Sequence, residues 1–356
     1  MTPQRLGPPF LALIIGLLSG TLAYFINMPL PWMLGSMIGV TIVAMAGAPI
    51  KAPNRLRPIV IPIIGVMLGS GMTAEIFGQL GQWAGTLIVL PFLLTAAGVA
   101  SYTVYRRIGG YDPTTAFYSS MPGGLNEMLL MGGAAGGDER RIALAHAARV
   151  LLIIFLVAMA FGLLFGVQTG AGGGNWTSLS APTVQDYALL IGCAVVGVPL
   201  ARLARFPAPG LFGPMILSGL VHILGWTHVS PPSLFIITAQ IVVGTIIGCR
   251  FLGATLREVG KDLALAALVT IIALLATGLF AFITAAIIGM SEAQAFLAFA
   301  PGGVTEMSLM TLAIGEDVAF VSIAHLIRIT LVIAIAPVLF RAFMRITGLA
   351  PTKDLD

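Results

Sequence analysis

The chain has 356 residues, of which 58% are hydrophobic and only 9% charged, and its formal net charge is +4. This composition excludes a water-soluble globule and indicates a polytopic membrane protein, because long apolar runs recur from end to end. The basic residues stand in short clusters between apolar runs, as in cytoplasmic loops, so we expect no nucleic-acid partner. Cys193 and Cys249 have no paired spacing and predict core residues rather than a disulfide or metal site.

Apolar runs of about 17 to 25 residues, long enough to cross about 30 Å of hydrocarbon, occur six times in each half of the chain. In the first half they begin near Pro9, Leu30, Arg57, Trp83, Pro113 and Arg140. In the second half they begin near Asp186, Pro209, Pro232, Asp262, Glu292 and Val318. The first run has a counterpart in the second half, which favours a permanent helix over a cleaved signal peptide.

One motif occurs twice, as PGGLNEM from Pro122 and as PGGVTEM from Pro301. The same spacing of 179 residues separates three pairs of residues, Glu127 and Glu306, His146 and His325, and Arg149 and Arg328. We interpret this as an in-register duplication with a first repeat over 1–166, an external Gly-rich linker over 167–185, a second repeat over 186–347 and a cytoplasmic tail over 348–356.

The distribution of Lys and Arg predicts how the segments cross the membrane. If the fifth segment of each half crossed, several basic clusters would lie outside, against the positive-inside rule. If it dips in and returns on the same side, every Lys and Arg outside the two motif helices is cytoplasmic. The predicted fold is therefore all-α and polytopic, with two inverted repeats of about five transmembrane helices and one re-entrant or broken hairpin each. Both termini are predicted to be cytoplasmic, in a bacterial inner membrane.

Each Pro-Gly-Gly breaks a helix at membrane depth, where backbone polar groups without partners are costly. Two broken elements that meet near the bilayer midplane are the usual site of secondary transporters. The predicted substrate or ion site therefore comprises Pro122, Gly123, Gly124, Asn126, Glu127, His146, Arg149, Pro301, Gly302, Gly303, Thr305, Glu306, His325 and Arg328. Ser119, Ser120 and Gln240 are weaker additions.

Two alternatives stay open for the charged residues of this site. Glu127 and Glu306 bind a proton, a cation or a substrate, or they form structural bridges to Arg149 and Arg328. In the same way, His146 and His325 are either packing residues or proton carriers.

With these motifs, the chain resembles the bacterial membrane AbrB-like family over nearly its whole length. Some members are labelled as ammonia monooxygenases or regulators of gene expression. An oxidase needs clustered His or Cys ligands, and the four histidines here are dispersed, so we expect no enzyme and no metal or other cofactor. The family is also similar to the superfamily of cation/proton antiporters, bile-acid-type symporters and anion transporters, which implies an alternating-access carrier.

The leading hypothesis is secondary transport of a small organic anion or polar metabolite, coupled to H⁺ or Na⁺ by an elevator-like movement. The alternative is a membrane sensor that regulates gene expression indirectly and transports nothing. The expected partners are a solute, a coupling ion, the lipid bilayer and, through a scaffold of the first segments of each half, a second copy in a homodimer.

Overall fold

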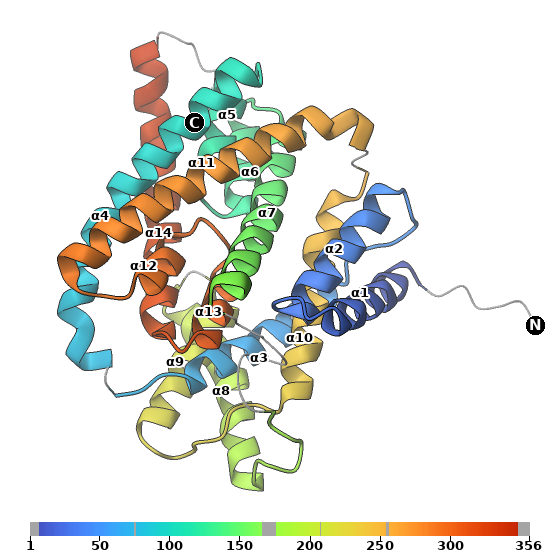
Figure 1. Ribbon diagram of the computed structural model, residues 1–356, viewed down its shortest axis with the longest axis vertical. Helices are drawn as coiled ribbons and strands as arrows, with labels where there is room; N and C mark the ends of the chain where they lie inside the picture. Colours follow the sequence, from blue (N-terminus) through green and yellow to red (C-terminus); the bar gives the residue numbers. More distant parts are fainter. Residues whose placement is uncertain (1–6, 75, 166–175, 207, 254–255, 348–356) are drawn as a thin grey trace, which may run out of the picture. The chain divides into compact units, whose positions relative to one another are not determined.

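The computed structural model describes residues 7–74, 76–165, 176–206, 208–253 and 256–347, and its described secondary structure is all helical (Figure 1). The α-helices are α1 (Pro8–Phe25), α2 (Pro31–Met45), α3 (Arg57–Ser70), α4 (Ile76–Thr103), α5 (Pro113–Ser120), α6 (Leu125–Ala134), α7 (Glu139–Phe165), α8 (Val184–Leu203), α9 (Pro209–Ile223), α10 (Ser233–Gly248), α11 (Leu256–Ile288), α12 (Glu292–Phe299), α13 (Val304–Ala313) and α14 (Val318–Thr347). A π-helical turn, Val104–Ile108, extends α4.

Seven helices in the described residues are long and apolar enough to span a membrane, namely α1, α4, α7, α8, α10, α11 and α14. The protein is thus an all-helical, polytopic membrane protein, as predicted. The helices α2, α3 and α9 have only 14 or 15 residues each, and the predicted total of about ten crossings requires that they cross as well.

The predicted segment starts agree with the observed helix starts, except for the fourth segment of each half. There the helix begins earlier, α4 at Ile76 and α11 at Leu256, while the apolar stretches Trp83–Ile108 and Gly260–Ile288 begin near Trp83 and Asp262 as predicted. Before its apolar stretch, each of these helices begins with residues that include polar ones, Gln79 and Gln82 in α4 and Arg257 and Glu258 in α11. Part of the predicted linker, 167–175, and the predicted tail lie outside the described residues.

The chain forms two compact units, and each contains parts of both halves of the sequence. The first unit comprises Met1–Gly78, Ile154–Leu256 and Thr305–Phe320, and the second comprises Gln79–Ile153, Arg257–Val304 and Val321–Asp356. The first three helices of each half therefore belong to the first unit. Both Pro-Gly-Gly breaks belong to the second.

Glycines set the packing of the first unit. A Cβ on Gly65 would collide with the Leu211 carbonyl of α9, and one on Gly69 with the Met215 carbonyl. The same arrangement recurs in the other half, where Gly244 and Gly248 of α10 pack on the backbone of α2. Small residues let helices approach closely within a membrane. The third helix of each half therefore packs against the second helix of the other half.

In the second unit, short helices start with matching caps. Asp112 accepts a hydrogen bond from the Thr115 amide at the start of α5, and Ser291 accepts one from the Gln294 amide at the start of α12. Such caps satisfy amides that have no partner within the helix. The bounds of α5 and α6 recur in α12 and α13 after the same 179 residues. The local structure therefore repeats, while the inverted membrane orientation of the halves stays a prediction.

Candidate functional site

Both Pro-Gly-Gly motifs interrupt a helix as predicted. Residues 121–124 separate α5 from α6, and residues 300–303 separate α12 from α13. The residue before each proline, Met121 or Ala300, has an extended backbone with ψ of 128° or 129°. The proline ring disfavours a helical conformation at this position, and proline itself has no amide hydrogen to donate. The breaks are therefore encoded locally.

The first break leaves carbonyl groups at the end of α5, and the His-x-x-Arg motif of α7 binds them. The Nε2 of His146 lies 2.9 Å from the Tyr118 carbonyl oxygen, and the Nη2 of Arg149 donates to the Met121 carbonyl at 3.1 Å. The same Nη2 lies 2.6 Å from Nδ1 of His146. The pair thus caps the carboxyl end of a half-helix, where a positive charge is favourable.

The second break has the same arrangement with one more bond. Nε2 of His325 lies 2.9 Å from the Leu297 carbonyl oxygen, and Arg328 donates from Nη1 to the Ala300 carbonyl. Nη2 of Arg328 also donates to the Gly302 carbonyl at 2.8 Å and lies 3.1 Å from Nδ1 of His325. Each bond of the first copy therefore has a counterpart 179 residues later.

These contacts assign the proton of each imidazole. A carbonyl oxygen only accepts hydrogen bonds, so Nε2 of His146 and of His325 must donate. A guanidinium only donates, so the Nδ1 atoms must accept. Both rings are therefore neutral in this arrangement, and each holds its arginine in place. This favours the packing interpretation over the proton carrier.

Glu127 is the third residue of α6, after the N-cap Gly124. A Cβ on Gly124 would collide with Oε2 of Glu127, so the carboxylate folds back over the start of its own helix. Free amides and the helix dipole favour a negative charge there. Both Glu127 and Arg149 are described, and they form no ion pair with each other.

Glu306 is the third residue of α13 and is 5% exposed. It belongs to the first unit, where the positive charges that act on its carboxylate are those of Arg250 and Arg57. Arg328 belongs to the second unit, so a bridge between Glu306 and Arg328 stays a prediction.

A small cavity of about 20 Å³ within the second unit brings the two breaks together. Pro122 and Pro301 both line it, together with Arg149 of α7. Its other polar lining residues are Ser101, Ser120 and Thr277. Their hydroxyl groups can rotate to donate or to accept. The cavity is large enough for about one water-sized group.

Arg149 and Arg328 are buried cations without a carboxylate partner among the described residues. Their exposed fractions are 4% and 3%, and the Nε atom of each is buried without a hydrogen-bond partner. The charge of Arg149 also acts on Arg328. Burying a charge without a counter-ion is costly, and a bound anion would offset that cost.

The remaining predicted residues contribute less to this cavity. The Asn126 side chain lies outside the described part of the structure. Thr305 and Gln240 are buried in the first unit, and Ser119 is buried in α5 with an unpartnered hydroxyl. Of the weaker additions, Ser120 lines the cavity.

Sequence reasoning missed Ser101 of α4 and Thr277 of α11. The signal available was a small polar residue within a long apolar helix. It is weak because hydroxyls usually bond to their own helix, as Ser101 does to the Ala97 carbonyl at 2.6 Å. The two residues are also not equivalent under the 179-residue spacing, so the repeat could not reveal them.

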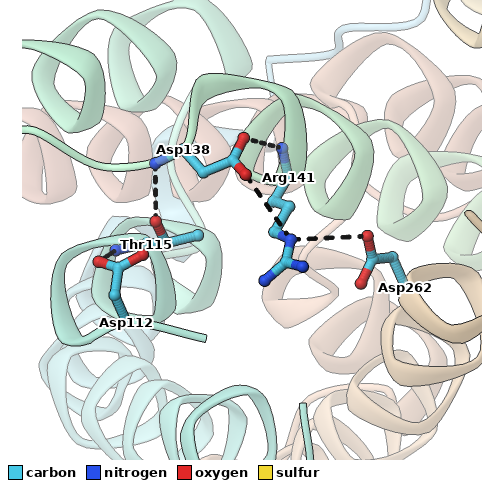
Figure 2. Close-up of polar contacts among 5 residues, drawn as sticks. All are labelled: Asp112, Thr115, Asp138, Arg141 and Asp262. Carbon is cyan, nitrogen blue, oxygen red and sulfur yellow. Dashed lines mark hydrogen bonds and ion pairs between the residues drawn. The ribbon is translucent and has the colours of Figure 1, made fainter. Parts of the chain in front are cut away.

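A polar cluster joins the starts of α5, α7 and α11 within the second unit (Figure 2). The Asp138 amide donates to Oγ1 of Thr115 at 2.7 Å, and Nε of Arg141 lies 3.6 Å from Oδ2 of Asp138 and 4.0 Å from Oδ2 of Asp262. The guanidinium also lies over the Tyr111 ring, 4.9 Å from its centroid. Burial raises the pKa of the Tyr111 phenol, which therefore stays protonated.

This cluster is not repeated in the other half. The positions equivalent to Arg141 and Asp262 hold Phe320 and Trp83. An ion pair therefore connects α7 and α11, whereas the equivalent positions of α14 and α4 hold aromatic residues. The two copies of the motif are equivalent at the breaks but differ at the positions of Arg141 and Asp262.

The sequence is similar to a known protein family over most of its length. The sequence model of the family described as "Transition state regulatory protein AbrB" matches residues 32–344. The "Uncharacterized protein YhjN" of Bacillus subtilis (strain 168) is 26% identical over 351 residues, covering 89% of this chain and 88% of that protein. The "Putative regulator AbrB" of Escherichia coli (strain K12) is 25% identical over 323 residues, covering 89% and 90%. With both Pro-Gly-Gly breaks and most of its length inside the matched region, the chain belongs to the AbrB family.

Proposed function

We propose that this protein is a secondary carrier for a small organic anion, whose charged group binds to Arg149 at the small cavity between the two Pro-Gly-Gly breaks. The observation that carries the proposal is the burial of Arg149 and Arg328 without carboxylate partners among the described residues. A planar guanidinium suits a carboxylate or a similar oxyanion. Broken helices from two repeats are the usual framework for such a site in transporters.

The two arginines have different roles in this proposal. Arg149 lines the cavity and has two described partners, so it is the residue that binds the anion. Arg328 has three described partners and mainly holds the second break in place. The carrier role makes the protein a transporter rather than an enzyme.

Glu306 is the candidate for the coupling ion. Its carboxylate is buried, and a proton or Na⁺ bound there would offset part of the burial cost. The positive charges of Arg250 and Arg57 compete with such a cation. Glu306→Gln removes the charge with little change of volume, so it should alter ion coupling while the protein stays folded.

The test is uptake of labelled small organic anions into proteoliposomes under an imposed H⁺ or Na⁺ gradient. Wild-type protein should accumulate at least one member of the panel, and Arg149→Met should not. Uptake that is absent across the panel, together with absent binding, would contradict the carrier.

The name of the Escherichia coli relative favours a second candidate, a membrane regulator that binds a solute without moving it. Such a sensor would bind an anion at Arg149 in equilibrium measurements and show no gradient-driven uptake. The same two measurements therefore distinguish the candidates.

The membrane orientation is part of the proposal and has its own test. Lys51 and Ser180 are exposed residues of the first unit, predicted to be cytoplasmic and external, respectively. Single cysteines at these positions should react with an impermeant thiol reagent from opposite sides of the inner membrane. Both native cysteines are buried, so their background should be low. Labelling of both from one side would contradict the predicted topology.

A further inference from the structure

A larger cavity of about 510 Å³ lies beside the arginine cavity in the second unit. It is formed by residues of α4, α5 and α14 and of the first break, and its lining is almost entirely apolar. Val99, Phe117, Leu331 and Phe343 are among its walls. This volume is in the range of sites that hold drug-sized organic ligands.

The two cavities share three lining residues, namely Leu94, Ser120 and Pro122. One side of this junction is therefore lined by the buried Arg149, and the other side is a long apolar wall. A ligand that occupies both needs an anionic head and a hydrocarbon tail.

We infer that the transported solute is an amphipathic organic anion, with its head at Arg149 and its alkyl or aryl tail in the larger cavity. This inference rests on the proposed carrier function and specifies its substrate class. The apolar wall by itself would also suit the acyl chain of a bilayer lipid. The adjoining unpaired cation favours the anion, because it supplies a binding partner for a charged head that the apolar wall cannot give.

Gly98 of α4 offers a direct way to fill the larger cavity. It lines the cavity, and a Cβ built on it meets no atom within 4 Å. Gly192 of α8 in the first unit is equally open and lines neither cavity. Gly98→Phe and Gly192→Phe are therefore matched variants, and Gly98→Leu provides a smaller obstruction should the phenylalanine prevent folding.

The experiment is calorimetric binding of n-alkanesulfonates, from methanesulfonate to octanesulfonate, to the full protein in nanodiscs, with empty nanodiscs as the blank. These probes stay ionised and do not cross the bilayer as neutral acids. Burial of each added methylene should tighten binding about fourfold until the cavity is filled. In Gly98→Phe or Gly98→Leu this gain should flatten, whereas Gly192→Phe should retain it.

Each other outcome has a distinct meaning. Binding of methanesulfonate without any gain from longer tails, or an equal gain in the Gly98 and Gly192 variants, would overturn the amphipathic substrate and leave the carrier proposal standing. Equal binding of the matching n-alkanols would show a lipid groove and also overturn it. Failure of every sulfonate to bind, with no anion uptake in proteoliposomes, would refute the carrier and the inference together.

Discussion

The extra hydrogen bond of Arg328 predicts that the two equivalent arginines differ in their importance for stability. Replacing either by methionine keeps the length of the side chain and removes every donor. Arg149→Met removes the guanidinium donor from two described acceptors, the Met121 carbonyl and Nδ1 of His146. Arg328→Met removes it from three, because the Gly302 carbonyl is added to the equivalent pair.

The expected difference in the free energy of unfolding follows from the number of hydrogen bonds that each variant loses. A buried acceptor that loses its partner costs about 1–3 kcal/mol. Removing a buried guanidinium also regains part of the cost of burying its charge, and this gain is similar at the two sites because both are almost fully buried. This gain therefore cancels when the unfolding free energies of the two variants are compared. Arg328→Met should therefore lower the free energy of unfolding by about 1–3 kcal/mol more than Arg149→Met does.

The assay is denaturant unfolding of both variants and wild type in the same micelles, followed by circular dichroism. Uptake of the anion should show the opposite order, with the larger loss in Arg149→Met because that residue lines the cavity. Equal destabilisation, or a larger loss of stability in Arg149→Met, would refute the reasoning from bond number.

Three further predictions concern other parts of the fold. Gly69→Leu should destabilise the protein by about 1–3 kcal/mol through overpacking, whereas Gly192→Leu should not, and thermal unfolding checks both. Burial raises the pKa of Asp317, so the folded state favours the protonated form, and this contribution to stability falls as the pH rises above about 4. Asp317→Asn should therefore remove that loss and raise stability at neutral pH, which pH-dependent unfolding of the variant and of wild type checks. Arg141→Gln should cost less than about 1 kcal/mol, with an effect that disappears in high salt, because its ion pairs are partly exposed.

Much of the helical framework was predictable because apolar runs and proline act locally. Pro113, Pro209 and Arg57 mark helix starts in the sequence and in the structure alike. The breaks at Pro122 and Pro301 were predictable for the same reason, since a proline determines the conformation of the residue before it. Local chemistry was sufficient for these elements.

The contacts of the site were harder to predict. A Glu and an Arg in equivalent motifs suggested ion pairs, but the described structure gives Arg149 backbone and imidazole partners instead. The sequence pattern identifies charged residues, whereas the free carbonyls at the end of a half-helix become visible only when the helix end is placed beside α7. The larger cavity was not predictable either, because its apolar lining residues look like ordinary membrane-facing ones.

The glycine packing of the first unit has a consequence for biogenesis. Helix α3 packs on α9, and α2 packs on α10, so the earliest helices of the chain complete their packing only after residues far downstream have been synthesised. Contacts of such long sequence separation form slowly. The first half should therefore depend on the membrane insertion machinery or on chaperones until the second half emerges. Two halves expressed as separate polypeptides should each be degraded alone and should protect each other when they are produced together.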